Sequence, residues 1–399
     1  MTEQKRLLVL GGSPFQVPLI EKAKALGLYV ITCDYLPDNP GHALADEYYD
    51  ASTTDKEAVL EVAKRCRADA ITSFCSDPAV PTVAYVAEVL GLPGPSLVSV
   101  EMLTEKDKFR GLMKSVGLNV PTCYTVKEGE LPSSIESTQN YIVKPVDSSG
   151  SKGITKSSGE IGPLKKAVDY ALQFSRAGRC IIEEFIDGKQ VHGDAFVKDG
   201  KLIYYYLGDH YFFTGTNSFI PISTRWPANI SAKAMHSVVE QAEKLVQAAG
   251  YLQGPINIEA RIGSDDKAYI IEIGPRNGGN FVPIIQQRLS GFDFTKSVIN
   301  LALGKQEVST SFTSFSAGAH YILHAEKGGK FSGVTVGGLL GKCLFFKKVF
   351  KNKGDEVKTY TGSNHTIGVL LFDFEGSEFS DMATCEIFDL IDITADYYG

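Results

Sequence analysis

The most constraining feature of the sequence is a pair of alternating segments, Ile256–Ile262 and Ala268–Gly274. Both alternate apolar and polar residues with a period of two, which is typical of half-buried strands. The four residues Gly263–Asp266 between them have the composition of a turn. The sequence therefore predicts a β-hairpin, whose core face carries three isoleucines: Ile258, Ile271 and Ile273.

Two glutamates are expected to face each other on the other side of this hairpin. If the turn is centred at 265–266, Glu259 and Glu272 are equally far from that centre and lie directly opposite. Opposed side chains are roughly 4.5–5.5 Å apart, and like charges at that distance are destabilising. A divalent cation that bridges both carboxylates to ATP phosphates would neutralise them, because Mg²⁺ prefers oxygen ligands. The alternative is that Arg261 and Arg276 neutralise the pair as a surface ion network.

A second segment suits phosphate binding. The stretch 141–153 reads YIVKPVDSSGSKG, in which an apolar strand delivers Lys144 and a loop of small residues follows: Ser148, Ser149, Gly150, Ser151 and Gly153. Small side chains let backbone N–H groups approach phosphate oxygens, and the lysine supplies a positive charge. The alternative is a solvated hairpin loop, and the Walker pattern is absent.

Strands and helices alternate in the first 95 residues. Strands are expected at Arg6–Leu10, Tyr29–Cys33 and Ala70–Ser73, with helices at 16–26, 56–66 and 81–90. This order predicts a Rossmann-like parallel sheet that is covered on both faces. Gly11-Gly12 and Asp34 would suit a dinucleotide site, but the third glycine of that motif is missing. An inert or substrate-contacting domain is therefore favoured.

The remaining sequence changes character twice. The segment 92–95 (LPGP) interrupts both periodicities, and residues 96–305 then read as α+β. Residues 306–399 are rich in strands and aromatic residues, and glycines break them into short segments.

Composition excludes several classes of protein. A net charge of −7 argues against a nucleic-acid partner. No apolar segment approaches the roughly 20 residues of a membrane span. The seven cysteines include no C-x-x-C pair, so a disulfide framework or a structural zinc site is not expected. These features together favour a cytoplasmic protein.

In combination, the motifs resemble the ATP-grasp superfamily, and most closely its carboxylate–amine ligase and biotin-carboxylase-like members. The order agrees: Lys108 before a helix, the lysine strand with its loop, IIEEFIDG at 181–188, and the glutamate hairpin with Pro275-Arg276. The resemblance implies a pre-ATP-grasp domain over 1–95 and an ATP-grasp domain over 96–305, whose lid subdomain spans about 120–185. It also implies a β-rich C-terminal domain over 306–399.

The resemblance also implies the roles of individual residues. Lys108 and Lys144 would contact the ATP phosphates, and the loop from Ser148 to Gly153, with Ser149, Gly150 and Ser151, would close over them. The adenine amino group would bind Glu183, and the backbone of the hinge would read the adenine edge. The hinge residues concerned are Glu184, Phe185 and Ile186.

Two positions depart from the pattern of many relatives. Gln190 stands where a glutamate binds the ribose, and His192 could share that role. Gly274 stands where an asparagine is a third metal contact, so a substrate group, water or Asn280 would have to replace it.

The implied cofactors are ATP and Mg²⁺, with Mn²⁺ as a substitute. Glu259 and Glu272 would hold the metal, while Lys144 and Arg276 would act in catalysis. The implied activity is amide formation: a small carboxylic or amino acid is activated as an acyl phosphate, and an amine attacks it.

The small-molecule substrates would contact Asp209, His210, Arg225 and Asn280. Alternatives are an enzyme of purine-type metabolism that uses bicarbonate or formate, and a non-catalytic nucleotide-binding regulator. The C-terminal region would cap the substrate site or form a homodimer interface.

Overall fold

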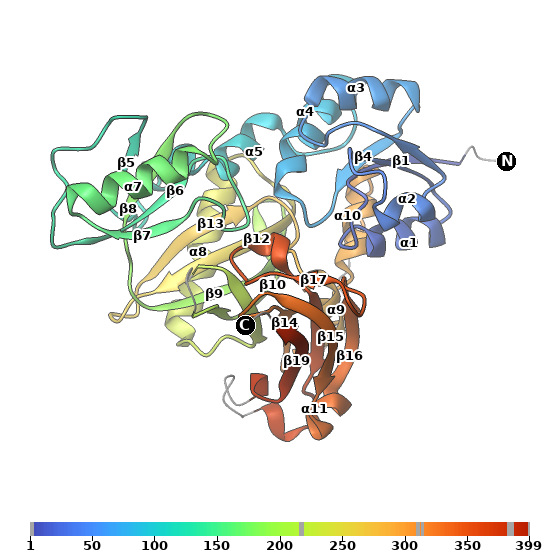
Figure 1. Cartoon of the computed structure of the whole chain (residues 1–399). Coiled ribbons are helices and arrows are strands. Elements are labelled where there is room, and N and C mark those ends of the chain that lie inside the picture. The colour runs from blue at the N-terminus through green and yellow to red at the C-terminus, as the bar shows by residue number, and fades with distance from the viewer. Residues whose placement is uncertain (1–3, 215–218, 309–311, 313–314, 381–386, 398–399) are drawn as a thin grey trace.

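The N-terminal region is a four-stranded parallel sheet with the order β3-β2-β1-β4, drawn in blue in Figure 1. The computed structural model of the chain describes residues 4–214, 219–308, 312, 315–380 and 387–397. The strands of this region are β1 (Arg6–Leu10), β2 (Tyr29–Cys33), β3 (Glu47–Tyr49) and β4 (Ala70–Ser73). Its helices are α1 (Val17–Ala25), α2 (Pro40–Leu44), α3 (Lys56–Arg65), α4 (Val80–Leu90) and the 3₁₀ helix η1 (Asp77–Ala79). The three predicted strands match β1, β2 and β4, whereas α2 and β3 were not predicted.

Apolar strands explain why this sheet is covered on both faces. Leu8 and Leu10 of β1 pack with α3 and α4, whereas Leu7 and Val9 pack with α1 and α10 (Phe294–Ala302). A hydrogen bond within the N-terminal region stabilises the Gly11-Gly12 turn: the Asp34 carboxylate accepts from the N–H of Gly12 at 3.1 Å. That contact accounts for the glycine turn without a dinucleotide.

A smaller sheet forms the lid region, at the upper left of Figure 1. Two helices lead to it, α5 (Leu97–Thr104) and α6 (Lys106–Ser115). Its order is β5-β8-β6-β7, and helix α7 (Ile161–Leu172) packs on one face. The strands are β5 (Cys123–Val126), β6 (Asn140–Pro145), β7 (Thr155–Ser158) and β8 (Cys180–Glu184).

The central sheet has eight strands in the order β13-β12-β9-β10-β11-β14-β18-β16. Five of them precede residue 305: β9 (Lys189–Lys198), β10 (Lys201–Phe212), β11 (Pro221–Trp226), β12 (Gln253–Ile262) and β13 (Ala268–Gly274). The other three follow it: β14 (Gly318–Leu323), β16 (Leu344–Val349) and β18 (Gly368–Asp373). Helix α8 (Ala232–Ala248) packs on one face, and α9 (Val282–Ser290) contacts strands of the same sheet before α10 (Phe294–Ala302). The expected domain boundary at 305/306 therefore does not interrupt the hydrogen bonding of the sheet.

The C-terminal region adds a small sheet of order β17-β15-β19. Its strands are β15 (Gly329–Val336), β17 (Glu356–Val357) and β19 (Ile391–Tyr397), accompanied by α11 (Gly338–Cys343), η2 (Ser363–His365) and η3 (Glu378–Ser380). The predicted multidomain α/β and α+β class is thus confirmed. In the part of the chain that the structure describes, no helix is long and apolar enough to span a membrane. The six cysteines in that part are free thiols, and Cys385 lies outside it.

The predicted hairpin is β12 and β13, and its register agrees with the prediction. Glu259 pairs with Glu272. A bulge follows directly, because Ala260 pairs with Ile270 rather than with Ile271. Ile270 is fully buried in the core, whereas Ile271 lines the cavity between the lid and the central sheet that is described below. The prediction that Ile271 belongs to the core was wrong, because a one-residue bulge exchanges the faces of a strand.

Candidate active site

The positive charges near Glu259, which include Arg276 and Lys144, do not offset its burial and its repulsion by Glu272. Glu259 accepts a hydrogen bond from the Gln190 amide at 2.9 Å, and the Lys106 ammonium lies 4.0 Å from Glu272. Burial, and next the charge of Glu272, raise the pKa of Glu259 to about 7. Two carboxylates in this state are destabilising until a cation binds between them.

The arginines that could have neutralised the pair are engaged elsewhere. Arg261 donates to Gln190 at 3.1 Å and to the carbonyl oxygen of Ile186 at 2.9 Å. Arg276 forms a bidentate ion pair with Asp77 at 2.5 and 2.7 Å. The alternative of a surface ion network around the glutamates is therefore not what the chain adopts.

The donor set fits Mg²⁺. Within the described ranges, no group of three or more His, Cys, Asp or Glu side chains could hold a metal by itself. Two carboxylates leave coordination positions for phosphate oxygens and water, which is how Mg²⁺ is usually bound beside a nucleotide.

Helix α6 brings a different lysine to the site from the one predicted. Lys106 is 8% exposed, and its ammonium donates to the carbonyl oxygen of Ser148 at 2.7 Å. Lys108 points away and pairs with Glu101 and Glu105 at 3.1 and 2.8 Å. Helical spacing was the signal that could have separated them, because Lys106 shares the buried face with Phe109, Arg110 and Met113.

A buried ion network supports the lysine strand. Glu183 is paired with Arg110 at 2.6 Å and with Lys144 at 2.5 Å. Burial alone would raise the pKa of Glu183, but these two cations lower it to about 2. Arg110 also donates to the carbonyl oxygen of Ile271 at 2.9 Å, so the network reaches the glutamate hairpin. The sequence analysis did not identify Arg110, although helical spacing places it on the same buried face of α6 as Lys106.

These groups line a cavity between the lid and the central sheet. Of the predicted nucleotide and metal residues, nine line it: Lys144, Ser151, Glu183, Glu184, Phe185, Ile186, Gln190, Glu259 and Glu272. Ser148 and Ser149 line an adjoining cavity, which shares Lys106 and Glu272 with the first and also contains Asp77 and Gly274. Gly150, His192 and Lys108 line neither.

The small-residue loop lies over the first cavity. Ser151 donates its hydroxyl hydrogen to the carbonyl oxygen of Phe219 at 2.6 Å, and the rings of Phe185 and Phe219 meet edge to face at 6.1 Å. Gly150 has a φ of +68° and Ser151 a φ of +59°, a left-handed backbone that glycine adopts without strain. The loop therefore connects the hairpin strands β6 and β7 and contacts the segment before β11.

The predicted substrate residues do not come together. His210 stacks on His192 with ring centroids 4.5 Å apart, on the face of the sheet that carries Glu259. Asp209 and Arg225 are paired neighbours on the opposite face. Asn280 lines none of the cavities above, and its φ of +52° places it in the turn before α9.

His192 belongs to a buried polar cluster rather than to the cavity between the lid and the central sheet. Its ring nitrogens lie 3.1 Å from the hydroxyl of Thr224 and 3.0 Å from the amide of Asn257. Burial, and next Arg276, lower the pKa of His192 to about 3, so the ring is neutral. Asp194 accepts from the same Asn257 at 2.8 Å and from the N–H of Gly278 at 2.7 Å. This cluster therefore ties the turn after β13 to β9.

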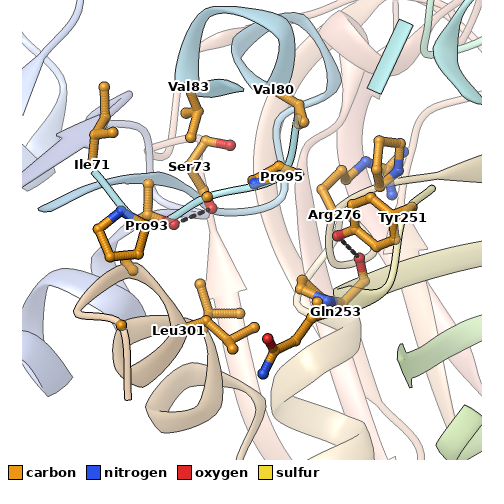
Figure 2. Close-up of a pocket in the computed structure, with 18 of the residues that line it drawn as sticks. Ile71, Ser73, Val80, Val83, Pro93, Pro95, Tyr251, Gln253, Arg276 and Leu301 are labelled. Atoms are coloured by element: carbon orange, nitrogen blue, oxygen red, sulfur yellow. Dashed lines mark hydrogen bonds between the residues drawn. The ribbon is translucent and has the colours of Figure 1, made fainter. Parts of the chain in front are cut away.

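A further cavity lies on another side of Arg276, between the N-terminal sheet and α10 (Figure 2). Its walls are mostly apolar, with Ile71, Val83 and Leu301 among the side chains that project into it. Arg276 is the only predicted site residue in its lining. An apolar chamber does not suit a triphosphate, whereas the cavity with the two glutamates is lined by charged side chains such as Lys106 and Lys144.

Comparisons with known proteins agree with this geometry. Residues 137–283 match the ATP-grasp domain. A phosphoribosylamine–glycine ligase from Methanosarcina acetivorans is 26% identical over 368 residues, which cover 83% of this chain and 79% of that protein. The carbamoyl phosphate synthase large chain of Caldanaerobacter subterraneus is 26% identical over 232 residues, 56% of this chain, but the match spans only 21% of that protein. The solved L-amino acid ligase of Bacillus licheniformis superposes with a TM-score of 0.80 at 22% identity, covering 100% of both chains.

The matched segment identifies residues 137–283 as an ATP-grasp domain, and the likeness to the solved structures shows that the whole chain shares their fold. The chain thus contains an ATP-grasp domain, and the relatives that it resembles include, by name, a phosphoribosylamine–glycine ligase.

Proposed function

We propose that this chain is an ATP-dependent carboxylate–amine ligase that activates a small carboxylic or amino acid as an acyl phosphate. The observation that carries the proposal is the facing pair Glu259 and Glu272 beside Lys106, under a folded small-residue loop. A non-catalytic nucleotide sensor would not need a carboxylate pair of this kind. The names of the relatives, a phosphoribosylamine–glycine ligase and an L-amino acid ligase, favour an amino acid as one substrate.

In this proposal the nucleotide occupies the cavity under the lid. The adenine lies near Phe185 and Ile271, and the backbone of the hinge reads its edge. Lys106, in place of Lys108, and Lys144 contact the phosphates. Glu183 is paired with Arg110 and Lys144, so its main contribution is to orient the Lys144 ammonium. A hydrogen bond that Glu183 accepts from the adenine amino group is secondary to these two ion pairs.

Glu259 and Glu272 would hold Mg²⁺, or Mn²⁺ as a substitute. When bound, the metal supplies charge neutralisation for the triphosphate. Gln190 keeps Glu259 oriented through its 2.9 Å hydrogen bond. The metal would need no third protein ligand beside the two glutamates, because phosphate oxygens and water would complete its coordination.

The reaction then has two steps. A carboxylate oxygen of the acid attacks the γ-phosphorus of ATP, the bond to the β-phosphate oxygen breaks, and ADP leaves. The amine nitrogen next attacks the carbonyl carbon of the acyl phosphate, the C–O bond to phosphate breaks, and the nitrogen loses a proton. Arg276 stabilises the negative oxygens of the acyl phosphate and of the tetrahedral state that follows. Phosphoryl transfer depends mainly on such positioning.

His210 remains a candidate contact for the substrate, because it lies on the face of the sheet that carries Glu259. Asp209 and Arg225 are on the opposite face, so we assign them no substrate contact.

The test is ADP release measured with a panel of acids and amines, in which the twenty amino acids are tried singly and in pairs. We expect ADP release that requires both an acid and an amine, with one amide formed per ADP by mass spectrometry, and none for Glu272→Ala. Release that depends on formate or bicarbonate would favour the purine-type alternative. Nucleotide binding without release under any condition would favour a regulator.

A further inference from the structure

An ion pair joins the N-terminal region to the segment that follows the glutamate hairpin. Asp77 begins η1, directly after β4, and Arg276 follows β13, 199 residues later. The Nε and Nη2 atoms of Arg276 donate to the two carboxylate oxygens of Asp77 at 2.5 and 2.7 Å. The side chain of Asp77 is 25% exposed, and that of Arg276 is 13% exposed. A bidentate pair that is shielded from water fixes both the position and the plane of a guanidinium group.

The pair leaves part of the guanidinium group available. Of its five N–H donors, Asp77 takes two, and the carbonyl oxygen of Asn277 takes a third from Nη1 at 3.0 Å. One N–H on Nη1 and one on Nη2 remain. Two donors in a fixed plane suit two oxygens of one phosphoryl or carboxylate group.

Gly274 explains why there is room for this pair. A Cβ atom at Gly274 would lie 3.3 Å from Oδ1 of Asp77 and 3.3 Å from Cζ of Arg276. A Cβ atom at position 274 would therefore require the pair to shift by a few tenths of an ångström, and a longer side chain would have to displace it further. Asp77, Gly274 and Glu272 line the same cavity, so this space belongs to the active site.

We infer that Asp77 is a positioning residue for Arg276, and that it occupies the space left by the missing side chain at Gly274. The N-terminal region then completes the active site by holding the arginine of the ATP-grasp hairpin in place. The inference rests on the proposed role of Arg276 in binding the transferred phosphoryl group.

The experiment measures the affinity of the MgADP-loaded protein for inorganic phosphate by calorimetry. Phosphate is the probe because it needs no knowledge of the acid or the amine. We expect Asp77→Ala to weaken phosphate binding by between about tenfold and a hundredfold, the usual effect of removing a group that orients a ligand. The affinity for MgADP itself should stay unchanged. Asp77→Glu should restore part of the phosphate affinity, which a merely structural contact would not predict.

The coupling to Gly274 gives a second arm. Gly274→Asn alone should also weaken phosphate binding, because the new side chain meets the pair. In the double variant Asp77→Ala/Gly274→Asn, the asparagine has room, so the combined loss should be smaller than the product of the two single losses. Multiplicative losses would overturn the claim that Asp77 and position 274 share one space.

A matched control is Asp373→Ala, which removes another aspartate–arginine pair, with Arg288 at 2.7 Å, and should leave phosphate affinity unchanged. If Arg276→Ala itself has no effect on phosphate, the proposed function of Arg276 fails. If Arg276→Ala weakens phosphate binding but Asp77→Ala and Asp77→Asn do not, the present inference fails alone. Should Asp77→Ala not bind MgADP, the isosteric Asp77→Asn decides the question.

Discussion

The affinity of the protein for Mg²⁺ should depend strongly on pH near neutrality. The pKa of Glu259 is raised to about 7 in the absence of metal, by burial and by Glu272, so a cation that binds below this pH has to displace a proton. Lowering the pH from 8 to 6 reduces the ionised fraction of Glu259 from about nine-tenths to about one-tenth. We therefore expect Mg²⁺ to bind roughly tenfold more weakly at pH 6 than at pH 8, a difference of about 1.4 kcal/mol.

The folding stability of the metal-free protein should change with pH in the opposite sense. A carboxyl group whose pKa is higher in the folded chain binds an extra proton there, so its contribution is present at low pH and is lost as the pH rises through about 7.

Calorimetric titration of Mg²⁺ into the protein saturated with a non-hydrolysable ATP analogue, at pH 6, 7 and 8, measures the first effect. The affinity of the analogue for Mg²⁺ alone is measured at each pH and subtracted. Glu259→Gln removes the titrating group, so its residual Mg²⁺ affinity should be low and almost independent of pH. Equal Mg²⁺ affinity of the unmodified protein at pH 6 and pH 8 would refute the reasoning from the facing carboxylates.

Three further substitutions test the site. Lys106→Ala should weaken ATP binding about tenfold or more by calorimetry, whereas Lys108→Ala should change it less than twofold, since an exposed pair contributes little; the reverse ranking would restore the original sequence prediction. Lys144→Met should weaken ATP binding and also destabilise the fold, because it removes one counter-charge of the buried Glu183. Breaking a buried ion pair costs about 3–5 kcal/mol when no other partner remains. Because Arg110 still pairs with Glu183, we expect a loss at the lower end of that range in a urea titration. Arg276→Ala should lower kcat by about 10²–10³ with nearly unchanged ATP affinity, and an unchanged kcat would leave it a structural role only.

Regular periodicity made much of the fold predictable. The strand bounds of β1, β2 and β4 followed from short apolar runs, and the facing of Glu259 and Glu272 followed from two-residue alternation about the turn. Three features escaped for local reasons. The bulge beside Ala260 leaves no mark in a two-residue pattern, so Ile271 was placed on the wrong face. Segments as short as α2 and β3 carry too few residues for a period to emerge.

Long-range contacts were the less predictable part of the site. Asp77 and Arg276 are 199 positions apart, and only the folded chain brings them together. Lys106 differs, because the helical spacing of α6 already distinguished it from Lys108. The position of Asp209 on the opposite face from His210 also followed from alternation once the strand was known.

The uninterrupted central sheet limits how this protein can be shortened or fused. Removing everything after residue 305 would take β14 away from β11, which pairs with it through four residues, Ser223 to Trp226. The bare edge of β11 would then present unpaired N–H and C=O groups, ready to join a strand of another molecule. A fragment cut to match the ATP-grasp segment should therefore self-associate, and an expression design that keeps β14 and β18 should avoid it.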